Sequence, residues 1–342
     1  MKVSTHSTIH KRMKCFVDFI APEKEKRDKI KQQSAEIRAC IEKHAKEDGY
    51  TIASSAYSGS FAKKTGLRRY LLGKDEVEGQ DIDIVFLLED KDKDGNALDC
   101  MIHRFKGYLK KCYPDSEISN TKSSATIHFT GSKQNFDAVP LIKTNRENIQ
   151  KLIRTEGTDR QSSAQKQVEF IRKRNRSSNE VEGVVRFNDC LRLVKWWRYH
   201  MQSESDVFGN HEGDKKVPSF LLDLLCAKAY DKLGVKATYA ETLFEWFDYL
   251  TEVVRDGLPV VFGNHQPSDT WNWEVIDPMD RSNNIAEDWC ICEIDELTYW
   301  LNDSANQISN AIASDSLKND SESLLYLTFL FGDSIKNQCK NV

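Results

Sequence analysis

The sequence "SGSFAKKTGLRRYLLGKDEVEGQDIDIVFLLED", residues 58–90, contains the pattern from which the fold of this chain is best predicted. Its last part predicts a strand from Asp81 to Leu88 that is buried on both faces, because a continuous apolar run begins at Ile84. Residues two apart in a strand point to the same side, so Asp81 and Asp83 project together. Isolated carboxylates are costly to bury, and a divalent cation is the first candidate to compensate them.

A third acid and a Gly-Ser pair complete this pattern. Asp137 lies in the otherwise apolar segment "NFDAVPLI" and can join Asp81 and Asp83 from a neighbouring strand. Gly59 and Ser60 lie at a predicted junction between a strand and a helix, where helix-start N–H groups and a hydroxyl suit phosphate oxygens. Each feature alone also fits a solvated strand edge or an ordinary turn. Their combination favours a metal site that binds phosphates.

The remaining sequence predicts a mixed lobe followed by a helical one. Helical patterns cover residues 6–20, 22–48 and 96–114, and "SATIHFTGSKQNFDAVPLI" predicts a hairpin. This first lobe ends near Lys143, and the polar segment 155–183 is a predicted connection. Apolar residues at helical spacing then recur in residues 188–201, 218–233, 238–256 and 294–314. The sequence therefore predicts an α+β protein of two lobes.

Composition excludes several classes of protein. The 342 residues have a formal net charge of −4, which argues against a protein that coats nucleic acid. We expect a cytoplasmic protein without a membrane span, because no apolar run is long enough and "MKVSTHSTIHKRMKCF" has no apolar signal core. The nine cysteines are scattered without a CxxC pair, which predicts reduced thiols and no zinc knuckle.

Three segments resemble the active-site segments of the DNA-polymerase-β-like nucleotidyltransferases: "SGSFAKKT", "GQDIDIVFLL" and "NFDAVPLI". Within that superfamily the chain is most similar to the oligoadenylate synthetase and cyclic GMP–AMP synthase branch. "CLRLVKWWR" resembles the helix that carries a triphosphate-binding lysine, here Lys195. "VPSFLLDLLCAKAY" resembles the next helix, with Ser219 for phosphate and Phe220 for the donor base. "VIDPMDRSNNIA" resembles a DP-x-D-x-x-N-N segment.

The bacterial cGAS/DncV-like nucleotidyltransferases (CD-NTases) of antiphage signalling are the best match to these segments. Without the resemblance, the sequence pattern would place Lys195 on a solvated helix face. It would make Ser219 a helix cap and Phe220 a core residue. The resemblance implies a two-lobed nucleotidyltransferase fold. Residues 1–150 would form N-terminal helices and a catalytic palm with a mixed sheet, and residues 151–342 a helical lobe that closes the nucleotide cleft.

The resemblance also implies a mechanism. Asp81, Asp83 and Asp137 would be the catalytic residues and would hold two Mg²⁺ or Mn²⁺ ions. The substrates would be NTPs, with ATP the most expected of them. Attack on the α-phosphate would release pyrophosphate, and a second attack would close a cyclic di- or trinucleotide. The nucleotide would be bound by Gly59, Ser60, Lys195, Ser219 and Phe220.

Two alternatives stay open at this point: a linear oligoadenylate synthetase or other RNA- or small-molecule nucleotidyltransferase, and a catalytically silent nucleotide sensor. The complete acid triad argues against the silent sensor. Nothing matches the zinc ribbon of the animal DNA sensor, and the basic residues form two short clusters, residues 63–69 and 172–176. We therefore expect no obligatory DNA or RNA activator, and a protein partner as the regulator if the activity is regulated.

Overall fold

The chain folds into two compact units in a computed structural model that describes residues 2–23, 27–72, 75–77, 81–89, 100–131, 134–146, 149–155, 160–180, 185–210, 213–264 and 273–342. The sheet unit comprises Glu23–Gly66 and Gln80–Phe170, and the helical unit comprises Met1–Pro22, Leu67–Gly79 and Ile171–Val342. The boundary predicted near residue 150 differs from this division. The first helix groups with the C-terminal helices, because its apolar face is buried against them.

The sheet unit is built on one mixed β-sheet, in which β4 and β7 pair in parallel and the other described pairs are antiparallel. The strand order is β1-β4-β7-β6-β5, and β8 and β9 continue from β7. The predicted hairpin is β6 and β7. The strands are β1 (Ile52–Tyr57), β4 (Ile82–Leu88), β5 (Glu117–Asn120), β6 (Ala125–Phe129), β7 (Gln134–Lys143), β8 (Gln150–Leu152) and β9 (Arg160–Ser162).

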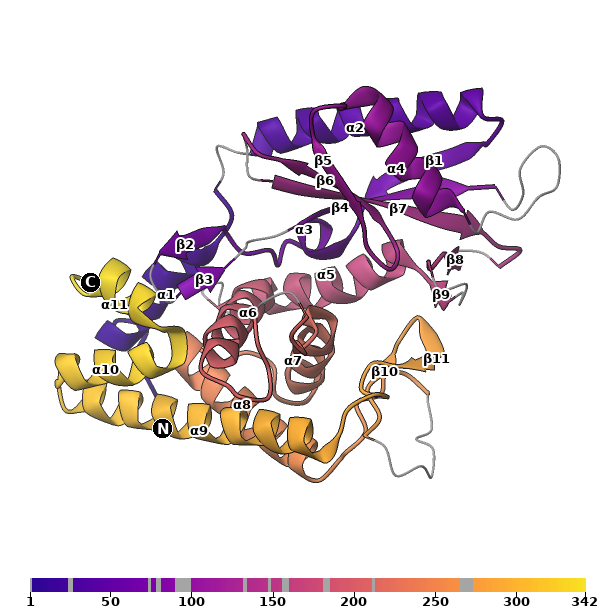
Figure 1. Cartoon of the computed structure of the whole chain (residues 1–342). Helices are drawn as coiled ribbons and strands as arrows, with labels where there is room; N and C mark the ends of the chain where they lie inside the picture. The colour runs from indigo at the N-terminus through magenta and orange to yellow at the C-terminus, as the bar shows by residue number, and fades with distance from the viewer. Residues whose placement is uncertain are drawn as a thin grey trace. The chain divides into compact units, whose positions relative to one another are not determined.

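Helices α2 (Arg27–Glu47) and α4 (Met101–Cys112) share a hydrophobic core with one face of this sheet (Figure 1). Alternate residues of β4, beginning with Ile82 and Ile84, are buried in that core. The residues between them, beginning with Asp83, are only partly buried, because strand side chains alternate between faces. The prediction of burial on both faces of this strand was therefore wrong, and the partly buried face is the one that presents Asp83.

The helical unit surrounds the aromatic residues of α6. Trp196 packs edge-on against Phe16 of α1, and Trp197 packs against Phe247 of α8 and Trp300 of α9. Helix α5 (Ala164–Glu180) contributes residues to both units. The other elements of this unit are α1 (Thr8–Ile20), β2 (Tyr70–Leu72), β3 (Asp75–Val77), α6 (Phe187–Ser203), α7 (Ser219–Leu233), α8 (Tyr239–Arg255), β10 (Ile276–Asp277), β11 (Asp280–Asn284), α9 (Ile291–Ser316), α10 (Asp320–Phe331) and α11 (Asp333–Cys339).

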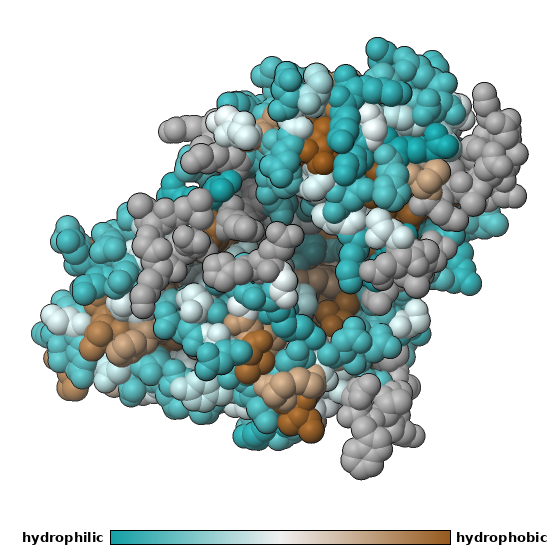
Figure 2. Space-filling view, viewed as in Figure 1, coloured by the Kyte–Doolittle hydropathy of each residue, from teal (hydrophilic) through white to brown (hydrophobic). Residues whose placement is uncertain are grey.

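Most of the molecular face in Figure 2 is hydrophilic, with small apolar patches. Among the exposed apolar side chains are Leu325 and Phe329, one turn apart on α10. Within the described residues, every helix is too short or too polar to cross a membrane.

Two pairs of cysteines form disulfides, Cys40–Cys112 and Cys290–Cys292. For these four residues the prediction of reduced thiols was wrong. Cys40 and Cys112 are 72 residues apart in sequence, but the packing of α2 on α4 brings their Cα atoms to 6.4 Å, within the range that a disulfide spans. The spacing of cysteines along a sequence does not show such a contact between helices.

Candidate active site

Asp83 and Asp137 lie directly beside each other in the sheet. The parallel register of β4 and β7 pairs these two residues, and neighbouring strands are separated by about 4.8 Å. Both side chains are partly buried, whereas Asp81, which precedes β4, is exposed. The charge of Asp81 nevertheless acts on Asp83. The fold therefore brings together the three acids that the sequence pattern predicted.

The turn at Gly59 packs against the carboxylate of Asp83. Strand β1 ends at Tyr57, the N–H of Ser58 donates to the backbone oxygen of Asp83 at 2.9 Å, and the short helix α3 (Gly59–Lys63) begins. Gly59 has φ +57°, and a Cβ on it would lie 1.8 Å from Oδ2 of Asp83. Only glycine satisfies both the left-handed backbone and this close approach. Gly59 and Ser60 therefore begin α3 next to the acids.

Two hydroxyl groups hold Asp137. Ser124 donates a hydrogen bond of 3.0 Å to Oδ1 of Asp137, and the hydroxyl of Thr126 donates to the same oxygen. Oδ2 of Asp137 takes part in neither of these two hydrogen bonds. We did not predict either hydroxyl residue from the sequence, although a signal was present: the predicted hairpin turn at residues 131–132 fixes a register that pairs Thr126 with Asp137.

The site carries excess negative charge. Burial, followed by the neighbouring charges of Asp137 and Asp81, raises the pKa of Asp83 to about 7, and the charge of Lys63 opposes this shift. Lys63 is a buried residue of α3. Carboxylate oxygens are hard ligands of the kind that Mg²⁺ prefers. A divalent cation fits this cluster, because its positive charge would offset the burial and the repulsion that raise the pKa of Asp83.

The candidates from the second lobe lie in the helical unit. Lys195 on α6 is buried, and its Nζ lies 2.8 Å from Oδ1 of Asp223 on α7. This ion pair differs from the solvated lysine that the bare sequence pattern suggested. Ser219 is the exposed first residue of α7, and Phe220 beside it is partly buried. Asp223 follows Ser219 by one helical turn, and an acid within the apolar sequence "SFLLDLL" is the signal that could have identified it.

The DP-x-D-x-x-N-N segment forms the β10–β11 hairpin and its polar side chains hold that turn. Asp277 accepts hydrogen bonds from the N–H of Met279 and from Asn283, at 2.8 and 3.3 Å. The side chain of Asn284 accepts from the N–H of Val275 and donates to the backbone oxygen of Trp273. These contacts give the segment a structural role within the helical unit.

The mixed sheet with adjacent strand-borne acids and flanking helices defines an α+β nucleotidyltransferase fold, as predicted. Residues 8–175 match the family model of SMODS, the second messenger oligonucleotide or dinucleotide synthetase domain. The resemblance to CD-NTases stated from the sequence is thereby confirmed. A search of curated proteins found no match.

Solved CD-NTase structures share this fold. CdnC of E. coli MS115-1, in a complex with HORMA-deltaN, gives a TM-score of 0.75 at 23% identity over 97% of this chain and 99% of that one. The CdnC structure with ATP gives 0.74 at 24% identity, covering 95% and 98% of the two chains. Bradyrhizobium diazoefficiens CdnG, in complex with GTP, gives 0.73 at 14% identity and covers 99% of each chain. Vibrio cholerae DncV, in complex with the linear intermediate 5' pppA(3',5')pG, gives 0.66 at 14% identity and covers 96% of each.

Proposed function

We propose that this protein is a nucleotidyltransferase that makes a cyclic oligonucleotide from ATP, alone or with a second NTP, and releases pyrophosphate. The observation that carries the proposal is the in-register pairing of Asp83 with Asp137 beside the glycine turn at Gly59. That arrangement supports a site in which carboxylate oxygens and turn N–H groups act in one small region. A nucleoside triphosphate with its cations needs both kinds of group.

The acids have distinct roles in this proposal. Asp81, Asp83 and Asp137 would hold two Mg²⁺ or Mn²⁺ ions, which supply charge neutralisation for the triphosphate and lower the pKa of an acceptor hydroxyl. The hydrogen bonds from Ser124 and Thr126 hold the carboxylate of Asp137 in place for this role. Backbone N–H groups at Gly59 and Ser60 would bind phosphate oxygens. The sheet thus contributes orientation and electrostatic complementarity.

We also propose nucleotide-binding roles for three residues of the helical unit. Lys195 and Ser219 would bind the triphosphate and Phe220 the base. The 2.8 Å contact with Asp223 pairs Lys195 with a carboxylate in a buried setting. An incoming phosphate would have to compete with Asp223 for Lys195.

The relatives support a cyclic product. The SMODS description names second messenger oligonucleotides and dinucleotides, and the DncV structure contains a linear dinucleotide intermediate. ATP and GTP are present in the solved structures of CdnC and CdnG. Two functions compete with this proposal. A synthetase of linear oligonucleotides would use the site in the same way until the second nucleotidyl transfer, which closes the ring. A silent nucleotide sensor would bind the nucleotide in the same way but would not carry out the first transfer.

We further propose that the enzyme acts in the cytoplasm in an antiphage signalling system, under control of a protein partner. The complex of CdnC with HORMA-deltaN supports a partner of this kind. The formal net charge of −4 supports an activity that does not depend on DNA or RNA, because binding to nucleic acid favours a basic protein surface.

The decisive experiment incubates the purified protein with the four NTPs and either Mg²⁺ or Mn²⁺, treats the products with alkaline phosphatase and analyses them by mass spectrometry. A cyclic product resists the phosphatase because it has no terminal phosphate. Asp83→Asn is the inactive variant, and Asp115→Asn, in the exposed turn after α4, is its matched control. Phosphatase-sensitive oligomers would indicate a linear synthetase. Nucleotide binding without pyrophosphate release, with the partner protein also present, would indicate the sensor.

A further inference from the structure

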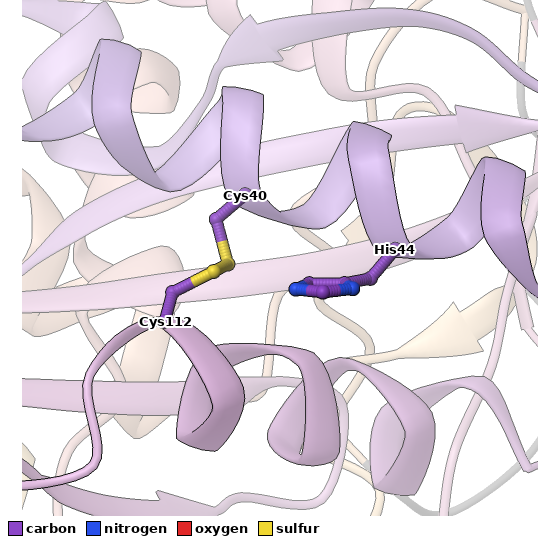
Figure 3. A group of neighbouring side chains, drawn as sticks. All are labelled: Cys40, His44 and Cys112. Carbon is purple, nitrogen blue, oxygen red and sulfur yellow. A yellow bond between two sulfur atoms is a disulfide. The ribbon is translucent and has the colours of Figure 1, made fainter.

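Cys40, His44 and Cys112 form a cluster on the helical cover of the sheet. Cys40 and His44 are one turn apart on α2, and Cys112 is the last residue of α4. The possible ligand atoms of the three side chains all lie within 4.8 Å of one another. The two sulfur atoms are bonded, and one ring nitrogen of His44 faces them (Figure 3).

The imidazole of His44 is held in one orientation. Its Nδ1 lies 2.7 Å from Oε2 of Glu47, and its ring stacks on Tyr108 with centroids 5.9 Å apart. A Nδ1–H that donates to a carboxylate fixes the tautomer and leaves the lone pair on Nε2. Histidines that ligate metals are oriented by a carboxylate in this same way. The Glu47 contact is therefore independent support for metal binding, beyond the proximity of two cysteines.

The chemistry of the three donors selects a soft or borderline metal ion. Two thiolates and one imidazole match the preference of Zn²⁺, and three protein ligands leave a fourth position for water. Cys40 is buried, and the side chain of His44 is only 13% exposed. In the oxidised protein the two sulfur atoms are bonded to each other, so Cys40 and Cys112 cannot act as thiolate ligands.

We propose that Cys40, His44 and Cys112 form a redox-dependent zinc site. A dithiol supplies two electrons and two protons, which convert the disulfide into two thiols while the dithiol becomes a disulfide. One Zn²⁺ then binds both sulfurs and Nε2 of His44, and the two thiol protons are released to solvent. In either state a bond joins the C-terminal half of α2 to the end of α4.

This site is separate from the candidate active site. The residues of α2 and α4 pack on the face of β4 that carries Ile82 and Ile84, whereas Asp83 belongs to the alternate set of β4 residues. The zinc proposal therefore does not depend on the proposed enzymatic function. Its tests can be read without a nucleotide.

The first test is titration with Co²⁺, which replaces Zn²⁺ and gives a thiolate-to-metal charge-transfer band that carboxylate sites do not give. We expect the protein reduced with a phosphine to bind one Co²⁺ with this band, and added Zn²⁺ to abolish it. The oxidised protein should show no band. Cys40→Ser and Cys112→Ser should each lose it, while Cys100→Ser, at an exposed free cysteine, should keep it.

The second test uses variants that keep the disulfide and so guard against a failure to fold. His44→Gln should weaken binding of Co²⁺ at least tenfold, and Glu47→Gln about tenfold, because it removes only the orienting contact. The proposal is overturned if the reduced wild-type protein gives no band. It is equally overturned if the band survives in both serine variants or if His44→Gln leaves the affinity unchanged, and the cluster would then be a disulfide alone.

Discussion

Lys195 and Asp223 form an ion pair whose side chains are only 6% and 3% exposed. The two residues come from adjacent helices, α6 and α7, and neither charge has much solvent to stabilise it. Removing one partner of such a pair leaves an uncompensated buried charge. Asp223 therefore determines how any substitution of Lys195 should be interpreted, because a loss of nucleotide binding could arise from a loss of folding.

We predict that Lys195→Ala and Asp223→Ala each lower the free energy of unfolding by about 3–5 kcal/mol. The double substitution Lys195→Met with Asp223→Leu should restore most of that stability, because apolar side chains of similar volume replace the pair. Denaturant unfolding measures these changes. If the two alanine variants are as stable as the wild type, the pair contributes little and the buried geometry is not maintained in solution.

In the stable double variant, ATP binding should still be weak. We predict a larger loss of affinity there than in Phe220→Ala, because a charge-assisted phosphate contact contributes more than one stacked base. Calorimetric titration with ATP and Mg²⁺ compares the two variants. Equal and small losses would show that Lys195 and Phe220 are not nucleotide ligands.

Substitution of Gly59 should damage both stability and activity. Gly59→Ala forces its Cβ onto Asp83 and places a non-glycine residue at φ +57°, so we expect destabilisation and at least a hundredfold lower turnover. Adding Asp83→Ala removes the clash and should recover part of the stability, though none of the activity. Gly107→Ala is the matched control: its Cβ meets no atom within 4 Å in α4, and it should stabilise the helix by about 0.5–1 kcal/mol.

The raised pKa of Asp83 predicts a specific dependence of stability on pH. Between about pH 4 and pH 7 the folded state keeps a proton that the unfolded state has released, so the stability of the metal-free protein falls as pH rises through this window. Asp83→Asn removes this dependence. One pKa unit corresponds to about 1.4 kcal/mol, and with solvent screening we expect the variant to be more stable by about 1–3 kcal/mol at pH 8.

The same variant separates stability from catalysis. Asp83→Asn should abolish turnover while it raises the melting temperature at pH 8, and Mg²⁺ should stabilise the wild type more than the variant. Asp115→Asn should change neither property. Thermal unfolding at pH 5 and pH 8, with and without Mg²⁺, checks the prediction. Turnover within tenfold of the wild type would remove Asp83 from the proposed metal site.

Activity should not require a nucleic acid. We predict that nucleic-acid-free protein gives the same product, at a similar rate, with and without long DNA or RNA duplexes. The negative net charge and the two short basic clusters favour this outcome. A hundredfold rise on adding a duplex, lost steeply as salt increases, would contradict it and identify residues 63–69 or 172–176 as a duplex-binding surface.

The sheet unit was largely predictable because its information is local. The alternation around Asp83 determined which residues share a face, and the hairpin turn determined the register that pairs Thr126 with Asp137. The parallel pairing of Asp83 with Asp137 joins strands that are far apart in the sequence. Contacts between helices were not predictable in the same way. The pairing of Lys195 with Asp223 and of Cys40 with Cys112 depends on which helix faces pack together. A single sequence shows that a helix has an apolar face but does not show what covers it.

The packing of α1 also has a consequence for synthesis of the protein on the ribosome. The N–H of Ile9 donates to Asp315, Arg12 donates to the backbone oxygen of Asp320, and Phe16 packs against Phe331. These partners are translated about three hundred residues after α1, so the apolar face of α1 stays without its native cover for most of elongation. Chains that stall before α9 should therefore expose that face to chaperones and proteases. The exposed face of α1 would then mark a nascent chain that still lacks α9 and α10.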